Sequence, residues 1–218
     1  MIPETRFGKI RFSVLIVFLL LVLIDLFLIP SYWTRKYKPR EGDFIFQSLL
    51  RSELVKLIEG ATNSEFSHVG ILKRNEAGNW VVVESMGSVH ETPLWEFIAR
   101  GRMDHFAVYR QNPELSKYIS GFETEMGKYY GRPYDFRYDM DADFIYCSEL
   151  TYKACLTVSG IRLGKLTPMG ELNWKPFEKT IRKMENGGLP LDRILISPIN
   201  LAHAPELSLV FNNGYSGL

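Results

Sequence analysis

Cys147 is the residue of this 218-residue chain whose position best suits nucleophilic chemistry. It lies in FIYCSELTY, where an apolar stretch leads into a predicted helix at 147–158. The positive end of a helix dipole favours a thiolate and lowers the pKa of a thiol placed there. The alternative is a buried, unreactive cysteine, the common state of free cysteines. Cys155 lies further along the same predicted helix and is expected in the core.

A cysteine nucleophile needs a base to take its proton, and imidazole is the usual one. The chain has four histidines, His68, His90, His105 and His203. His68 opens a predicted strand in FSHVGIL, where the rim of a strand can hold a side chain rigidly beside a cleft. We therefore choose His68 as the candidate base and keep the other three as alternatives.

Glu84 is the candidate for the polar group that orients the imidazole. It ends the predicted strand 80–84, which follows the predicted strand 68–72 through the turn-rich segment KRNEAGN. In such a hairpin the start of the first strand lies opposite the end of the second. We therefore expect His68 and Glu84 to be cross-strand neighbours, with Cβ atoms about 5 Å apart. The alternative is a solvated carboxylate at a strand end.

The rest of the pattern predicts an α+β domain in which helices pack on a small antiparallel sheet. The Pro-punctuated tail at 190–211 is expected to wrap the core in extended or short helical pieces. Further predicted elements are strands at 43–47 and 105–110 and helices at 51–59, 94–99 and 113–130.

Composition excludes several classes of function. Lys and Arg number 26 and Asp and Glu 25, which gives a net charge of +1 and argues against nucleic acid as a partner. Two cysteines cannot build a disulfide framework. No CxxC motif or paired His/Cys cluster suggests a structural zinc, and we expect neither a metal nor another cofactor.

An apolar run at 12–29 predicts an N-terminal transmembrane helix. At 1.5 Å per residue the run would extend about 27 Å, close to the thickness of a bilayer's hydrocarbon core. A cleaved signal peptide is the alternative, but no A-x-A cleavage pattern follows the run. Tyr32 and Trp33 are typical of residues at the membrane interface. The carboxylate of Asp25 lies near the end of the run, where it can reach headgroups.

We therefore divide the chain into an uncleaved membrane anchor at 1–33, a charged linker at 34–41 and a globular domain at 42–218. Basic residues flank the apolar run on both sides in similar numbers, so the positive-inside rule gives almost no preference for either orientation. The short basic N-terminus favours a single-pass protein with its domain on the exported, periplasmic or extracellular side.

An ordered set of short motifs resembles a known enzyme family. In chain order the motifs are GDFIF (42–46), SHVGIL (67–72), VVVES (81–85), GRPYD (131–135) and YCSEL (146–150). They resemble the circularly permuted papain-like cysteine hydrolases of the YiiX/YebB type, relatives of the NlpC superfamily, over about residues 40–205. The resemblance implies a permuted papain-like fold, in which the histidine precedes the cysteine in the chain.

The resemblance also implies roles for particular residues. It implies a catalytic Cys147–His68–Glu84 triad, with the third member less fixed because the polar partner varies across the superfamily. Tyr134 of GRPYD matches a position that lines the cleft, where its hydroxyl could contact substrate or support an oxyanion; the alternative is a packed tyrosine. Tyr146 and Glu149 flank the cysteine and are further substrate-binding candidates, although Glu149 also suits a helix start by charge alone.

Three hypotheses of function follow. The first is a membrane-anchored amidase or peptidase that forms a thioester acyl-enzyme, with bacterial cell-wall peptides as one substrate class. The second is a lipid-directed thiol acyltransferase or esterase. The third is a non-catalytic binding module, which would have a degraded triad. The first two differ in the cleft, because an amidase should show polar groups for a peptide or amine, and a lipid enzyme an apolar groove.

Overall fold

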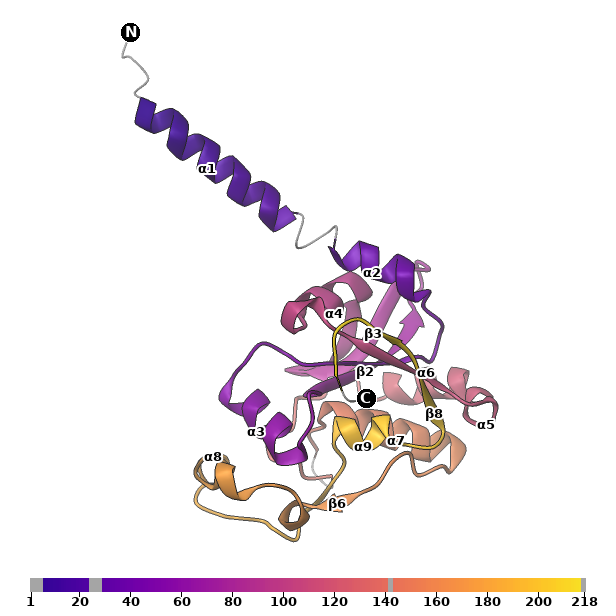
Figure 1. The fold of residues 1–218 in the computed structure, drawn as a ribbon. Coiled ribbons are helices and arrows are strands. Elements are labelled where there is room, and N and C mark those ends of the chain that lie inside the picture. Colours follow the sequence, from indigo (N-terminus) through magenta and orange to yellow (C-terminus); the bar gives the residue numbers. More distant parts are fainter. Residues whose placement is uncertain (1–5, 24–28, 141–142, 217–218) are drawn as a thin grey trace.

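The computed structural model describes residues 6–23, 29–140 and 143–216. Its centre is a six-stranded antiparallel sheet with the strand order β4-β3-β2-β1-β5-β8 (Figure 1). The strands are β1 (Phe44–Gln47), β2 (His68–Arg74), β3 (Trp80–Met86), β4 (Ser88–Pro93), β5 (Ala107–Gln111) and β8 (Leu207–Asn212). The helices are α1 (Arg6–Leu23), α2 (Ile29–Tyr37), α3 (Glu53–Thr62), α4 (Leu94–Arg100), α5 (Pro113–Ser116), α6 (Ile119–Gly127), α7 (Cys147–Ser159), α8 (Glu178–Met184) and α9 (Pro198–Ala202).

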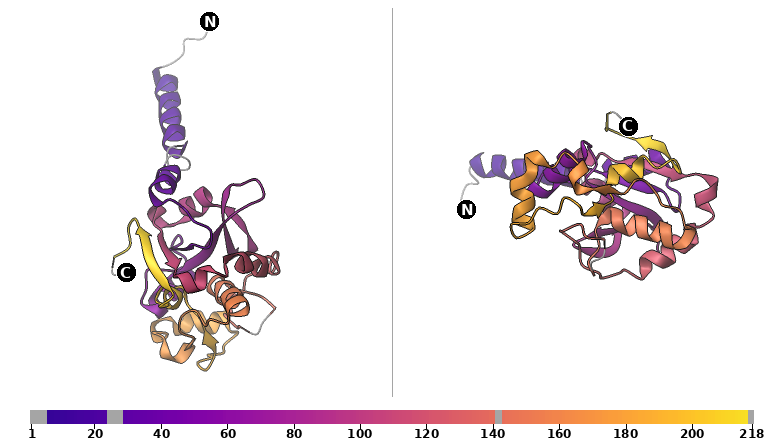
Figure 2. Two further views of the ribbon diagram at one scale, coloured as in Figure 1. Left: turned by 90° about the vertical axis from the view of Figure 1, so that its right-hand side faces the viewer. Right: turned by 90° about the horizontal axis from the view of Figure 1, so that it is seen from below.

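Helices cover both faces of the sheet (Figures 1 and 2). On one face, α6 and α7 pack on alternate side chains of the central strands, such as Phe46 and Ile71. On the other face, α4 packs on the side chains between them, such as Ile45 and Leu72, and α2 packs on α4. Because both faces of the sheet are buried, the sequences of these strands are continuous apolar runs. The expected α+β class with an antiparallel sheet is confirmed.

A third, smaller hydrophobic cluster lies beside the sheet and joins α3 to the segment between α7 and α9. Leu57 and Ala61 of α3 contact Ile181 of α8 there, with Met169 and Trp174 packed against them. A two-stranded sheet of β6 (Thr167–Pro168) and β7 (Ile194–Leu195) joins the two ends of this segment.

The predicted hairpin of β2 and β3 is confirmed, and each strand runs two residues further than expected. Strand β4 was not predicted. The single helix expected at 113–130 is wrong, because the chain forms α5 and α6 with a break at Tyr118. The break lets Leu115 enter the core and brings Gly121 against Val158 of α7, where a Cβ on Gly121 would lie 2.3 Å from a Val158 methyl group.

Helix α1 projects away from the sheet in each view (Figures 1 and 2). None of the helices in the described part of the chain combines the length and apolar character that crossing a membrane requires. The predicted span at 12–29 includes residues 24–28, which lie outside the described residues. Membrane attachment, the exported location and the three-part division of the chain stay predictions.

The expected linker at 34–41 is partly helical. It begins inside α2, and Tyr37, the last residue of that helix, is buried against Phe211 of β8. The Tyr37 hydroxyl donates to Asp43, a buried carboxylate that also accepts two hydrogen bonds of 2.7 Å from Arg110. The end of α2 is therefore fixed to the sheet.

Candidate active site

Cys147 and His68 meet where the first residue of α7 lies over the first residue of β2. The thiol and the imidazole are within hydrogen-bonding reach, and both residues are 2% exposed. The imidazole stacks on Phe97 of α4, with ring centroids 5.7 Å apart. The expected juxtaposition of a helix start and a strand rim is therefore present.

The charges around Cys147 favour a thiolate facing an imidazolium. Burial alone would raise the pKa of Cys147, but His68 and the backbone N–H groups of Val69 and Ser148 outweigh it and lower that pKa below its usual range. Burial alone would lower the pKa of His68, yet the Cys147 sulfur and the Glu84 carboxylate raise it to about 9. Each group stabilises the charged form of the other.

Glu84 lies beside His68, as expected, but diagonally rather than directly across. Ile71 pairs with Val83, so the same register sets Gly70 opposite Glu84, with His68 two residues away on the same face. A Cβ on Gly70 would lie 3.4 Å from the Glu84 Cβ and 2.3 Å from a methyl group of Val82, so glycine leaves the diagonal open. Glu84 Oε2 bonds to His68 Nε2, which leaves Nδ1 as the ring nitrogen for the thiol.

Two further residues hold the Glu84 carboxylate. Arg100, at the end of α4, donates from Nη2 to both carboxylate oxygens at 2.6 Å, and the Thr92 hydroxyl of β4 donates to Oε1. Glu84 is fully buried; burial would raise its pKa, but His68 and Arg100 lower it to about 2. Sequence reasoning missed both residues. The one available signal was an arginine at the end of the helix LWEFIAR, whose other residues are apolar except for Glu96.

Tyr134 and Tyr138 form a hydroxyl pair next to the nucleophile. Their oxygens are 3.1 Å apart, and both side chains are close enough for the Cys147 thiolate to raise their pKa values further, after the larger effect of burial. Only one of the two hydroxyl protons is used within the pair, so the other can be donated to a substrate oxygen. Tyr134 lines a cavity next to His68, and its contact with substrate stays a prediction. Tyr138 was not predicted.

Tyr146 and Glu149 lie behind the nucleophile. Glu149 accepts the Tyr146 N–H at 3.2 Å and pairs with Lys153 at 2.7 Å, which fixes the first turn of α7. The Tyr146 hydroxyl accepts the N–H of Ile196 at 3.1 Å. Neither residue lines the cavities next to Cys147 and His68, and the substrate-binding role of Tyr146 and Glu149 stays a prediction.

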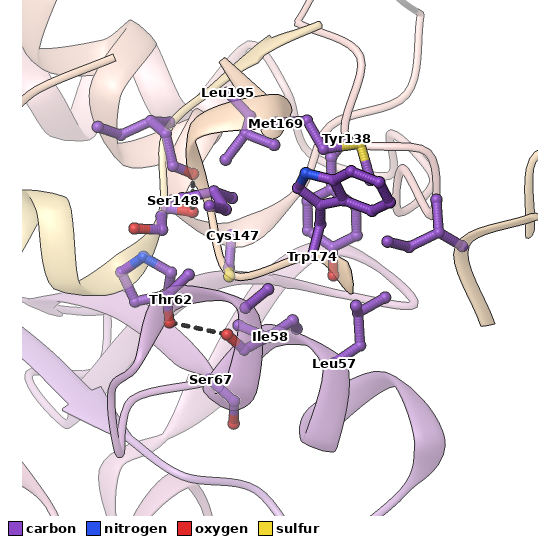
Figure 3. Close-up of a pocket in the computed structure, with 16 residues that line it drawn as sticks. Leu57, Ile58, Thr62, Ser67, Tyr138, Cys147, Ser148, Met169, Trp174 and Leu195 are labelled. Atoms are coloured by element: carbon purple, nitrogen blue, oxygen red, sulfur yellow. Dashed lines mark hydrogen bonds between the residues drawn. The ribbon is translucent and has the colours of Figure 1, made fainter. Parts of the chain in front are cut away.

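Two cavities adjoin the Cys147–His68 pair, one lined by the cysteine and the other by the histidine. The Cys147 cavity is lined by Cys147 and Tyr138 and by apolar residues of α3 and of the segment 169–198 (Figure 3). The His68 cavity is lined by His68, Tyr134 and Arg100. Ile58 and Ser67 line both cavities, so the two meet at the reacting pair.

The arrangement contains the parts needed for nucleophilic acyl transfer. A thiolate, a proton carrier hydrogen-bonded to a fixed carboxylate, and nearby N–H and O–H donors converge at the junction of two cavities. Among residues 6–23, 29–140 and 143–216, no three His, Cys, Asp or Glu side chains are grouped so that they could hold a metal ion.

Comparisons with known proteins identify the family of the chain. Residues 38–211 match the family described as permuted papain-like amidase enzyme, YaeF/YiiX, C92 family. The chain is 33% identical over 195 residues to the uncharacterized protein YiiX of Escherichia coli strain K12, covering 88% of this chain and 94% of that protein.

A solved structure gives the same result. The crystal structure of YiiX from Escherichia coli O157:H7, described as a metalloprotein, aligns with a TM-score of 0.76 and 30% identity, over 81% of this chain and 99% of that one. The resemblance seen in the sequence motifs is confirmed. The chain belongs to the YaeF/YiiX family of permuted papain-like amidases.

Proposed function

We propose that the protein is a cysteine hydrolase that cleaves an amide bond, with Cys147 as nucleophile, His68 as base and acid, and Glu84 as the orienting carboxylate. The observation that carries the proposal is the continuous series of contacts from the thiol through the imidazole to the carboxylate, on three residues that are each at most 2% exposed. A role in binding alone would leave this buried ion pair and its Arg100 support without use.

In this proposal each group has a part in the reaction. The Cys147 thiolate adds to the substrate carbonyl, and the free proton of the Tyr134–Tyr138 pair, with the N–H at the start of α7, stabilises the oxyanion. His68 then protonates the departing amine, which leaves a thioester on Cys147. Water, activated by neutral His68, attacks the thioester and releases the acid and the free thiol.

The second candidate, a lipid-directed acyltransferase or esterase, uses the same thioester. The apolar lining of the Cys147 cavity favours a lipid acyl group over the acyl group of a peptide. Whether water or another nucleophile receives the acyl group depends on what enters the His68 cavity.

The thioester is the species to look for. Incubating the protein with an acyl 4-nitroanilide or the matching 4-nitrophenyl ester, quenching with acid and digesting with trypsin should give an acylated peptide that contains Cys147. Cleavage at Lys153 separates that peptide from Cys155, which serves as an internal control. Acylation of both cysteines, or of neither while amine is released, would contradict the proposal.

A further inference from the structure

The Tyr134–Tyr138 hydroxyl pair lies at the border between the two cavities. Tyr138 lines the Cys147 cavity together with the nucleophile (Figure 3), whereas Tyr134 lines the His68 cavity. The 3.1 Å hydrogen bond between the two hydroxyl oxygens therefore joins one cavity to the other. A substrate carbonyl that is attacked by the sulfur of Cys147 lies near this border, where its oxygen needs a hydrogen-bond donor.

Tyr138 is the member of the pair whose hydroxyl proton is free. Burial raises the pKa of both tyrosines, but the hydrogen bond between them lowers the pKa of Tyr138 and raises that of Tyr134. These opposite directions fit a bond in which the Tyr134 hydroxyl donates and the Tyr138 oxygen accepts. The Tyr138 proton is then available to the oxygen of a carbonyl held at Cys147.

The backbone of Tyr138 has a conformation that aromatic residues rarely adopt. Its φ is 57°, in the left-handed region that favours glycine. Its ring packs against the rings of Tyr146 and Tyr134, with centroids 4.8 and 6.3 Å away. A residue keeps such a conformation only where surrounding contacts hold it.

Asp135 supplies the first of these contacts. It is 4% exposed, and its two carboxylate oxygens accept the backbone N–H groups of Arg137 and Asp139 at 2.8 and 2.5 Å. These two residues flank Tyr138 in the chain, so a single carboxylate holds the backbone on both sides of the tyrosine. The N–H of Asp135 in turn donates to the Ile145 carbonyl at 3.4 Å, which joins the loop to the segment before the nucleophile.

Arg193 supplies the second contact, from the segment between α8 and β7. Its Nη1 donates to the Arg137 carbonyl, and its guanidinium pairs with Glu185, with Nη2 3.1 Å from Oε2. Arg137 is therefore held at its N–H by Asp135 and at its carbonyl by Arg193. The loop that carries Tyr138 is fixed through its backbone by two charged side chains.

We propose that Tyr138 is the side-chain donor to the oxyanion, and that Asp135 and Arg193 are positioning residues that hold its hydroxyl beside Cys147. This inference rests on the proposed function, in which a tetrahedral oxyanion forms. When the sulfur adds to the carbonyl carbon, the π electrons of the carbonyl move to oxygen, and the Tyr138 O–H donates a hydrogen bond to that oxygen and keeps its proton. When the carbonyl re-forms, the carbon–nitrogen bond breaks and the amine leaves with the proton from His68.

Single variants test the assignment of the donor. Tyr138→Phe keeps the ring and removes the donor, so kcat for acyl anilides should fall by about 10²–10³-fold. Tyr134→Phe leaves the Tyr138 proton in place and should lower kcat by less than about tenfold. A larger loss in Tyr134→Phe than in Tyr138→Phe would overturn the assignment.

Asp135→Asn tests the positioning role. Asparagine keeps one of the two acceptor oxygens, so Tyr138 loses half of its backbone support, and kcat should fall by about 10–100-fold. Asp192→Asn is the matched control, because it removes an exposed carboxylate next to Arg193 in the sequence and should keep wild-type kcat. Equal kcat in Asp135→Asn and the wild-type protein would overturn the positioning role.

A double-mutant cycle separates positioning from a merely structural role. If Asp135 acts through the Tyr138 hydroxyl, Asp135→Asn should change kcat by less than about twofold in the Tyr138→Phe background. Alkylation of Cys147 by iodoacetamide displaces iodide at a saturated carbon and forms no oxyanion, so each variant should keep the wild-type alkylation rate. Equal losses of kcat in both backgrounds, or a parallel loss of alkylation, would overturn the inference. Arg193→Gln takes the place of Asp135→Asn in the cycle if thermal unfolding shows that Asp135→Asn is not folded.

Aldehyde binding distinguishes failure of this inference from failure of the proposed function. The Cys147 thiolate adds to the carbonyl of butyraldehyde, and the oxygen takes the imidazolium proton, which gives a hemithioacetal with its oxygen at the oxyanion position. The Kd, measured by protection of Cys147 from iodoacetamide, should rise about tenfold in Tyr138→Phe and less in Tyr134→Phe. This result in a wild-type protein that cleaves no anilide would support the inference and refute the amidase. Equal Kd values in a protein that cleaves anilides would do the reverse, and a protein that neither binds butyraldehyde nor cleaves anilides would contradict both.

Discussion

Cys147→Ala is expected to abolish turnover. Loss of the nucleophile in other triad hydrolases lowers kcat by about 10⁶-fold, and here no other side chain replaces the sulfur that forms the thioester. We expect kcat for acyl anilides to fall by at least about 10⁵-fold. The fold should persist, because alanine keeps the start of α7 and removes one small buried group.

Cys155→Ala is the matched control for this substitution. Cys155 lies two turns further along α7, where burial raises the pKa of its thiol to about 11, and it should be dispensable for turnover. Residual activity above about 1% in Cys147→Ala, or a comparable loss in Cys155→Ala, would remove Cys147 from the mechanism.

Glu84→Ala is expected to lower both stability and activity. It leaves Arg100 and His68 facing a buried space without their carboxylate, and breaking a buried ion pair in this way destabilises proteins by about 3–5 kcal/mol. The imidazole would also lose the group that selects its tautomer, so we expect kcat to fall by about 10³–10⁴-fold. Chemical denaturation and anilide kinetics measure the two effects.

Glu84→Gln separates charge from shape. Glutamine keeps the side-chain volume, so this variant should lose less stability than Glu84→Ala. The glutamine amide can, however, donate to Nε2 of His68 and so place the ring proton on Nδ1, the nitrogen that must accept the thiol proton. The activity of this variant should therefore stay low. Glu91→Gln is the control, since Glu91 on β4 forms a partly exposed pair with Lys73, worth about 0–1 kcal/mol. Wild-type stability and activity in Glu84→Ala would show that the carboxylate orients nothing.

The pH dependence of stability has a definite sign for Glu84. Its folded pKa of about 2 lies below the usual value of 4.5, so between these two pH values the folded protein binds fewer protons than the unfolded chain. The stabilisation from Glu84 is therefore fully present above about pH 4.5 and is lost as the pH falls towards about 2. Glu84→Gln should lack this part of the acid-induced loss.

Sequence reasoning could place the reacting pair because both residues lie at the ends of elements with clear local signals. Cys147 follows an apolar approach into a helix, and His68 opens a strand, so neither position depends on distant contacts. Glu84 required the hairpin register as well. The register was off by one diagonal step, because β2 runs on to Arg74 and the turn before Trp80 is therefore shorter than expected. The open position at Gly70 could not be foreseen.

The supports of the triad could not be predicted because they come from elements placed by tertiary packing. Arg100 reaches Glu84 only because α4 packs on the sheet through Phe97. Thr92 reaches Glu84 only because β4 pairs with β3 and extends the sheet. The Cys147 cavity depends on the 169–198 segment packing on α3, a contact between parts more than 100 residues apart.

The pH profile of Cys147 alkylation tests the central claim most directly, namely that His68 holds the sulfur as a thiolate. Iodoacetamide labelling of the wild-type protein, followed by peptide mass spectrometry, should already proceed at a pH below the usual thiol pKa of 9.0. In His68→Ala the profile should move to pH 9 or above, because burial then acts on the thiol without an imidazolium beside it. Wild-type labelling that begins only near pH 9, or one profile shared by the two proteins, would contradict the account.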